Sequence, residues 1–165
     1  KIYEGKIINL KVDTVELPNG KESTRECIEH PGAVAVIAQD NQNRICLVRQ
    51  YRYPVSQQLL EIPAGKLSPG EDPLECARRE LLEETGIVAK SWEKLYCYYS
   101  TPGFTDEIMH LYLATDLTRG ASQPDEDEFL EARMISYQEA FLKMSRGEIK
   151  DSKTLIALLH LAMEK

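Results

Sequence analysis

Residues 65–87 read GKLSPGEDPLECARRELLEETGI, and this stretch carries the clearest helix signals in the chain. Asp72 has the carboxylate of a helix N-cap, Pro73 suits the first helical position, and a glutamate stands three residues after the cap. Gly86 is the residue type that most often follows the last helical residue. We therefore expect a helix that begins at Pro73 and runs to Thr85.

The predicted helix carries several glutamates on one face. Glu80 and Glu84 are four residues apart and nearly aligned, and Glu83 lies beside them. The opposite, core-facing stripe consists of Leu74, Ala77 and Leu81. Like charges at this spacing destabilise an isolated helix by roughly 0.2–0.5 kcal/mol per pair, and carboxylates near a helix C-terminus also oppose its dipole. A Mg²⁺ ion would compensate these charges because it prefers carboxylate oxygens. On spacing alone, a metal site and a solvated acidic face both remain open.

The same stretch matches a longer pattern at every defined position. The pattern G-x5-E-x7-R-E-U-x-E-E-x-G-U, in which U is a bulky aliphatic residue, fits Gly65, Glu71, Arg79-Glu80-Leu81, Glu83-Glu84 and Gly86-Ile87. This is the Nudix box, and the chain resembles the Nudix hydrolases. The resemblance implies hydrolysis of a nucleoside diphosphate linked to a further group. It also implies that Glu80 and Glu84 hold Mg²⁺, with Mn²⁺ as the alternative ion, while Glu83 supports the cluster and Arg79 orients it through ion pairs.

Outside the box, period-two alternation and turn residues predict mainly β-strands. The first thirty residues indicate a hairpin that turns at Pro18-Asn19-Gly20. Further strands are expected at 33–38, 45–51, 59–62, 95–99, 108–114 and 132–135, and helices at 137–145 and 151–163. Since no regular βαβ repeat occurs, we expect the α+β class and the Nudix fold, a mixed β-sheet sandwiched between α-helices. The expected parts are an N-terminal β-hairpin over 1–30, which contributes to dimerisation, and a Nudix hydrolase domain over 31–165.

Two segments that flank the box resemble the ADP-ribose pyrophosphatase subgroup. One is TPGFTDE at 101–107, whose proline lies sixteen residues beyond the last glycine of the box. There the resemblance assigns Phe104 and Glu107 to substrate binding, although a Pro-Gly loop is also an ordinary turn. The other contains Arg52, aligned with a diphosphate-binding arginine, and Ala64, whose backbone carbonyl aligns with a metal ligand. A surface arginine on an edge strand is the alternative interpretation of Arg52.

An acidic run, Asp125-Glu126-Asp127-Glu128, aligns with the catalytic loop of the subgroup. The resemblance makes Glu126 the general base and Glu128 a further metal ligand, and a shift of the alignment by one or two residues exchanges their roles. Without the box, four consecutive carboxylates would simply indicate a solvated loop. A mobile loop would also deliver the base only after substrate and metal have bound.

The N-terminal hairpin is typical of the same subgroup. Its members resemble domain-swapped dimers in which N-terminal strands of one subunit pack on the other. Arg25 aligns with a substrate-contacting arginine that is donated across that interface. The resemblance therefore implies a homodimer with swapped N-terminal strands. It is incomplete in one respect, because Trp92 lies just past the box helix and provides no clear adenine clamp.

Composition and charge argue against other classes. The formal net charge is −7 and no basic stripe is visible, so we expect no nucleic-acid partner. No apolar stretch approaches the roughly 20 residues of a membrane span, and no N-terminal signal is visible, so we expect no membrane partner. None of the four cysteines is paired as CxxC, which favours reduced thiols and a cytoplasmic location.

Together these patterns predict a Mg²⁺-dependent enzyme that cleaves a small nucleoside-diphosphate sugar, ADP-ribose, to AMP and ribose 5-phosphate. GDP-mannose, ADP-glucose, NADH and FAD are alternative substrates. A non-catalytic ADP-ribose sensor is a third interpretation, but such modules usually lose box glutamates, and this chain retains all of them.

Overall fold

The structure is a computed structural model that describes residues 1–120 and 131–164. Its elements follow the chain in this order: β1 (Tyr3–Glu4), β2 (Asn9–Glu16), β3 (Glu22–Glu29), β4 (Ala33–Ala38), β5 (Arg44–Arg52), the short 3₁₀ helix η1 (Tyr53–Val55), β6 (Gln57–Glu61), β7 (Ala64–Lys66), α1 (Pro73–Thr85), β8 (Ile87–Tyr99), β9 (Ile108–Arg119), β10 (Glu131–Ser136), α2 (Tyr137–Ser145) and α3 (Ser152–Met163).

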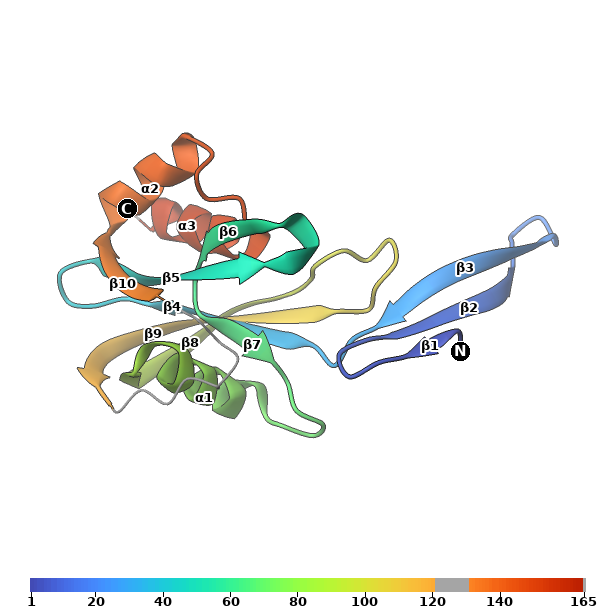
Figure 1. Cartoon of the computed structure of the whole chain (residues 1–165), viewed down its shortest axis with the longest axis horizontal. Helices are drawn as coiled ribbons and strands as arrows, with labels where there is room; N and C mark the ends of the chain where they lie inside the picture. Colours follow the sequence, from blue (N-terminus) through green and yellow to red (C-terminus); the bar gives the residue numbers. More distant parts are fainter. Residues whose placement is uncertain (121–130, 165) are drawn as a thin grey trace.

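Strands form the middle of the globular part, and helices cover them on both sides (Figure 1). One sheet is mixed, with the order β7-β4-β9-β8 and β4 parallel to β9, and the other is antiparallel, with the order β10-β5-β6. Helix α1 lies on one side of these sheets, and α2 and α3 lie on the other (Figure 1). The predicted α+β class, with β-structure between helices, is confirmed, and the strands divide into two sheets rather than one.

Strand β4 shows why the centre is stable. All six of its residues are buried, and they alternate between two hydrophobic clusters. Ala33, Ala35 and Ile37 belong to the cluster that includes residues of α3, whereas the intervening residues belong to the cluster that includes residues of α1. A strand that is covered on both faces has no polar side, which explains its continuous apolar sequence.

Helix α1 begins and ends as the sequence predicts. The Asp72 side chain accepts the backbone N–H groups of Leu74 and Glu75 at 2.9 and 3.2 Å. At the other end, Gly86 adopts a φ of +67° and donates its N–H to Leu82. These caps satisfy groups that a helix end leaves without partners. They fix where the helix begins and ends, and therefore the positions of its glutamates.

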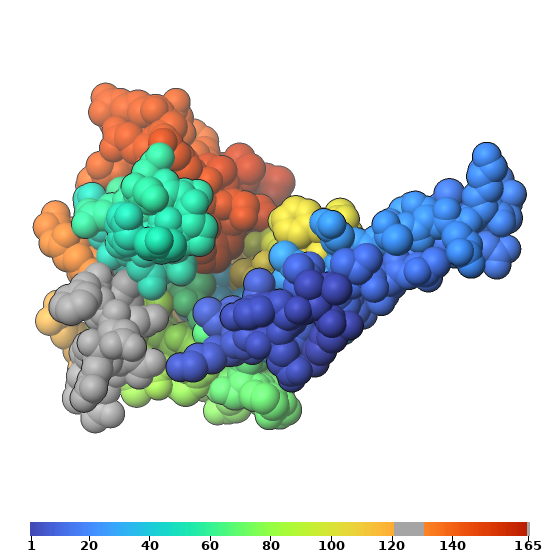
Figure 2. Space-filling model, turned by 45° about the vertical axis from the view of Figure 1, so that its right-hand side comes forward, coloured from blue at the N-terminus to red at the C-terminus, as the bar shows by residue number. Residues whose placement is uncertain are grey.

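The N-terminal strands β1, β2 and β3 form an arm that extends away from the globular part (Figures 1 and 2). The predicted hairpin is present, and β1 adds a third, short strand. The root of the arm contacts the loop before β9, where Ile28 N–H donates to the carbonyl of Phe104 at 2.7 Å. Several large apolar side chains of the arm are exposed, namely Ile2, Tyr3, Ile7 and Val12.

Candidate active site

The box carboxylates stand against the backbone of β7. Glu84 is only 6% exposed, and one of its carboxylate oxygens accepts the N–H of Ala64 at 3.1 Å. The carboxylate of Glu80 lies directly over Gly65, where an added Cβ would be 1.9 Å from the carboxyl carbon. Glycine at this position therefore leaves the space that the Glu80 carboxylate occupies, and an added Cβ would force that carboxylate to shift.

Arg79 links three carboxylates. Its Nε and Nη2 donate to the two oxygens of Glu71 at 2.9 and 3.1 Å, and its Nη1 donates to Glu80 at 2.8 Å and Glu83 at 2.9 Å. The hydrogen bonds from Arg79 lower the pKa of Glu71 to about 2. The same contacts raise the pKa of Arg79, with Glu71 as the largest cause. The Arg79 guanidinium therefore stays charged and holds the carboxylates of the acidic face in place.

The donor set of this face suits a hard divalent cation. Within residues 1–120 and 131–164, no three His, Cys, Asp or Glu side chains already converge in a metal-binding arrangement. Glu80 instead contacts Arg79, and Glu84 contacts the N–H of Ala64. Nevertheless, two carboxylates side by side on one helix, packed on a glycine backbone, provide the oxygen ligands that Mg²⁺ prefers. The chemistry of the donor set therefore fits the predicted ion.

A cleft of about 530 Å³ opens beside these carboxylates. Its charged lining residues are Arg52, Lys66, Lys153, Glu80 and Glu107, and His30 also lines it. Glu80 lies at the α1–β7 wall, and Arg52 reaches the cleft from the end of β5. Acidic and basic groups therefore share one cavity, which is the arrangement that a metal-bound diphosphate requires.

Arg52 forms a bidentate ion pair with Glu61. Its Nε and Nη2 donate to the two carboxylate oxygens of Glu61 at 2.8 and 2.7 Å, and Lys153 donates to the same carboxylate. Burial alone would raise the pKa of Glu61, but the hydrogen bond from Arg52 and the charge of Lys153 outweigh it and lower the pKa below its usual value. Because Nε and Nη2 donate to Glu61, the Nη1 edge of the guanidinium is available to bind another anion.

The loop at 101–107 contributes unevenly to the cleft. Glu107 lines it and accepts a hydrogen bond from the hydroxyl of Ser100. Phe104 is 52% exposed and is not among the residues that line the cleft. His30 also belongs to this region, although no sequence pattern indicated it: its Nδ1 lies 3.5 Å from Glu107, and its backbone N–H donates to Asp106 at 2.8 Å. No sequence signal could have found this contact, because the partners are far apart in the chain.

Arg25, another predicted substrate-binding residue, is not among the residues that line the cleft. Arg25 is on β3 of the arm, where its guanidinium donates to Ser23 and to the carbonyl of Thr24. The arm extends away from the globular part (Figure 2). Glu126 and Glu128 lie outside the described residues.

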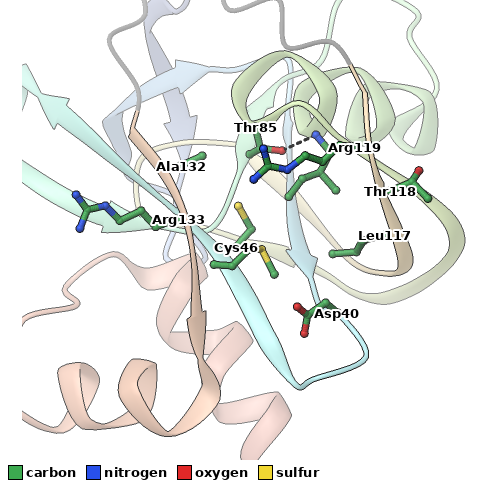
Figure 3. A pocket seen from close by; sticks show the side chains of 10 residues that line it. Asp40, Cys46, Thr85, Leu117, Thr118, Arg119, Ala132 and Arg133 are labelled. Atoms are coloured by element: carbon green, nitrogen blue, oxygen red, sulfur yellow. Dashed lines mark hydrogen bonds between the residues drawn. The ribbon is translucent and has the colours of Figure 1, made fainter.

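A second cavity, of about 200 Å³, lies between β5, β9, β10 and the end of α1 (Figure 3). Asp40, Cys46 and Arg119 are among its lining residues, and none of the box glutamates is. Burial, with a smaller contribution from the charge of Glu84, raises the pKa of the Cys46 thiol to about 12. Since only a thiolate is an effective nucleophile, this cavity lacks an activated cysteine.

Comparisons with known proteins show the family to which the chain belongs. The family model for the NUDIX domain matches residues 29–158, and that for the nucleoside diphosphate sugar hydrolase N-terminal domain matches residues 1–28. The chain is 47% identical to the methanol dehydrogenase activator of Bacillus methanolicus and 44% identical to the ADP-ribose pyrophosphatase of Bacillus subtilis (strain 168). Each alignment covers 100% of this chain and 90% of the relative.

A solved structure shows the same fold. The crystal structure of an ADP compounds hydrolase matches with a TM-score of 0.86, covering 98% of this chain and 88% of that chain at 22% identity. The fold, the box helix and the carboxylate cluster define a Nudix protein. The chain belongs to the Nudix family, and it is a hydrolase.

Among the described helices, none has both the length and the apolar composition needed to cross a membrane.

Proposed function

We propose that this protein hydrolyses ADP-ribose to AMP and ribose 5-phosphate in a Mg²⁺-dependent reaction. The observation that carries the proposal is that Glu80 and Arg52 line one cleft of about 530 Å³. A diphosphate in this cleft can therefore contact both a metal-binding carboxylate and the Arg52 guanidinium. The 44% identity to an ADP-ribose pyrophosphatase over the whole chain supports this choice of substrate.

The proposed roles follow from the contacts. Arg52 binds the diphosphate through its free guanidinium edge, while Glu80, Glu84 and the carbonyl of Ala64 hold Mg²⁺, or alternatively Mn²⁺. When bound, the cation neutralises the diphosphate and lowers the pKa of a bound water. Glu83 supports the carboxylate cluster, and Arg79 orients it.

The bond-breaking step requires a proton acceptor. Glu126 accepts a proton from the attacking water, and Glu128 supplies a further ligand; both roles rest on the family resemblance alone. Water attacks one phosphorus, the bond between that phosphorus and the bridging oxygen breaks, and AMP and ribose 5-phosphate leave. Glu107, which lines the cleft, and Phe104 at its loop contact the substrate in this proposal.

The active unit in this proposal is a cytoplasmic homodimer with swapped arms. The exposed apolar side chains of the arm would pack on the other subunit, and Arg25 would reach its cleft. The family match of residues 1–28 to an N-terminal domain of nucleoside diphosphate sugar hydrolases supports a specific role for the arm.

A substrate panel tests the proposed activity. ADP-ribose, ADP-glucose, GDP-mannose, NADH and FAD would be incubated with the protein and Mg²⁺, with and without EDTA, and phosphate measured after phosphatase treatment. We expect the highest kcat/KM with ADP-ribose and complete loss with EDTA. A higher kcat/KM with another compound would reject the substrate, and full activity in EDTA would reject the metal. Tight binding of ADP-ribose without any AMP release would identify a sensor.

Two substitutions test the metal site. Glu83→Gln and Glu84→Gln are each expected to lower kcat by orders of magnitude while the circular dichroism spectrum stays native, because each removes a charge at the cation without changing side-chain size. Wild-type turnover in both variants would reject the assignment.

Activation of a dehydrogenase is a second candidate function. It is favoured by the 47% identity to a methanol dehydrogenase activator, which exceeds the identity to the ADP-ribose pyrophosphatase. The test is the rate of a purified methanol dehydrogenase with and without this protein. A rate increase that is lost in Glu84→Gln would show that activation depends on the Nudix site, and an unchanged rate would exclude this candidate for that enzyme.

A further inference from the structure

The buried polar residues of the described chain are not scattered. They are Glu61, Glu84, Lys153, Thr154 and His160. Three of them, Glu61, Lys153 and Thr154, meet where the end of β6 faces the first turn of α3. Buried charges are costly unless they are paired and hydrogen-bonded, so such a concentration requires a reason beyond packing.

The contacts form a closed network around Glu61. Lys153 Nζ donates to Glu61 at 2.5 Å and to Asp151 at 2.8 Å. Asp151 in turn accepts the N–H and the hydroxyl of Thr154 at 2.9 and 2.6 Å. The Thr154 hydroxyl oxygen accepts the N–H of Ile62 at 2.9 Å. The first turn of α3 is thereby fixed to the strand end that carries Glu61.

The network also affects how much positive charge the cleft presents to a ligand. Arg52 and Lys153 both line the cleft and share the carboxylate of Glu61, which is 1% exposed. The second carboxylate, Asp151, caps α3, whose N-terminus carries roughly half a positive charge. With Lys153 in place, Glu61 cannot neutralise Arg52 completely. Without Lys153, the buried carboxylate would face Arg52 alone, and the guanidinium would attract an incoming anion less strongly.

We propose that Lys153 is a positioning residue for the diphosphate site: by sharing the Glu61 carboxylate, it keeps the positive charge of Arg52 available to a nucleoside diphosphate. The inference rests on the proposed function, in which Arg52 binds the diphosphate. It assigns the start of α3, which lies outside the Nudix box, to substrate binding.

The test compares binding and turnover in matched variants. The affinity for the uncleavable α,β-methylene analogue of ADP-ribose would be measured by calorimetry with Mg²⁺, and kcat and KM with ADP-ribose. Lys153→Met is expected to weaken analogue binding and raise KM by about tenfold while kcat changes by less than about threefold, because a uniform binding interaction is lost. The control is Lys150→Met, which removes an exposed lysine that contacts Gln57 and should change neither value.

A second substitution separates an effect that acts through Glu61 from direct contact of Lys153 with the diphosphate, since Lys153 itself lines the cleft. Adding Glu61→Gln to Lys153→Met removes the carboxylate that would otherwise neutralise Arg52, so the double variant is expected to recover analogue binding to within about threefold of wild type. Direct contact of Lys153 with the diphosphate would give no recovery. The melting temperature of each variant is measured as well, because a purely structural ion pair would change stability without a separate change in KM at temperatures where the protein is fully folded. If Lys153→Met alone does not fold, Glu61→Gln serves as the reference, and Lys153→Met added to it is expected to have no further effect.

Unchanged binding in Lys153→Met, or a double variant that binds as weakly as the single variant, would overturn the proposal. Failure of the proposed function gives a different result: wild-type protein that binds the analogue but does not cleave ADP-ribose leaves the comparison intact. Wild-type protein that neither binds the analogue nor cleaves ADP-ribose overturns both.

Discussion

Gly65 is the residue on which the carboxylate cluster depends most directly. In Gly65→Ala, the new methyl group would lie 1.9 Å from the carboxyl carbon of Glu80, so the carboxylate must move. Because a displacement of about 1 Å can cost about 100-fold in rate, we expect kcat with ADP-ribose to fall by about that factor or more. The control is Gly70→Ala, which has a φ of +77° and open space around it. It should lower the melting temperature but preserve kcat, and equal kcat in the two variants would contradict this argument.

Glu71 predicts a specific response to acid. Its pKa is lowered from the usual 4.5 to about 2 in the folded protein. A lowered folded-state pKa adds stability that is fully present above 4.5 and is lost as the pH falls toward about 2. The free energy of unfolding of wild type should therefore exceed that of Glu71→Gln at pH 7, and the gap should narrow between these limits. Urea titrations without divalent cations measure the free energy of unfolding of both proteins. A difference between them that does not change with pH would show that the ion pair of Glu71 with Arg79 is not the cause of the difference.

Single residues also show where sequence reasoning ends. Helical spacing predicted that Glu80, Glu83 and Glu84 share one face, and the resemblance to the Nudix box added Arg79, which contacts Glu80 and Glu83 in the structure. Neither could predict that Glu61 and Lys153 meet, since their contact spans 92 positions and depends on how β6 and α3 pack. Contacts of this kind follow from tertiary structure, and no local pattern encodes them.

At the scale of elements, α1 is the most predictable part of the molecule because its caps are local. Asp72 accepts two backbone N–H groups of the first turn. Asp72→Ala should lower the free energy of unfolding by about 1 kcal/mol, whereas Asp72→Asn should keep most of it because an oxygen acceptor remains. Urea denaturation distinguishes them. Equal destabilisation by both substitutions would assign the effect to charge rather than to the hydrogen bonds.

Strands β7 and β8 differ from prediction for a tertiary reason. Strand β7 consists of Ala64, Gly65 and Lys66, which have little strand propensity, and it exists because it pairs with β4. Strand β8 begins at Ile87 rather than near Leu95, since it pairs with β9 along its whole length and contains an irregularity between Lys94 and Tyr96. Its first half has consecutive exposed polar residues at Lys90-Ser91 and again at Glu93-Lys94, so period-two alternation does not reveal it.

At the scale of the whole molecule, the arm is the feature that one chain does not explain. The arm is a three-stranded sheet that projects from the globular part and exposes apolar side chains (Figure 2). Such an arrangement is unfavourable for an isolated subunit. A homodimer would bury these side chains and would bring Arg25 to a cleft that contains Arg52. Each active site would then combine the arm of one subunit with the globular part of the other.

Subunit mixing tests this arrangement. Arg25→Ala and Arg52→Ala should each be nearly inactive as homodimers. After unfolding and refolding together in equal amounts, half of the dimers should be mixed, and each mixed dimer should contain one site with both arginines, so about a quarter of the wild-type activity should return. If both arginines served the same site from a single chain, every site would lack one of them and mixing would restore nothing. Light scattering on the wild type gives the oligomeric state independently, and a monomer would exclude the shared site whatever the mixing experiment gave.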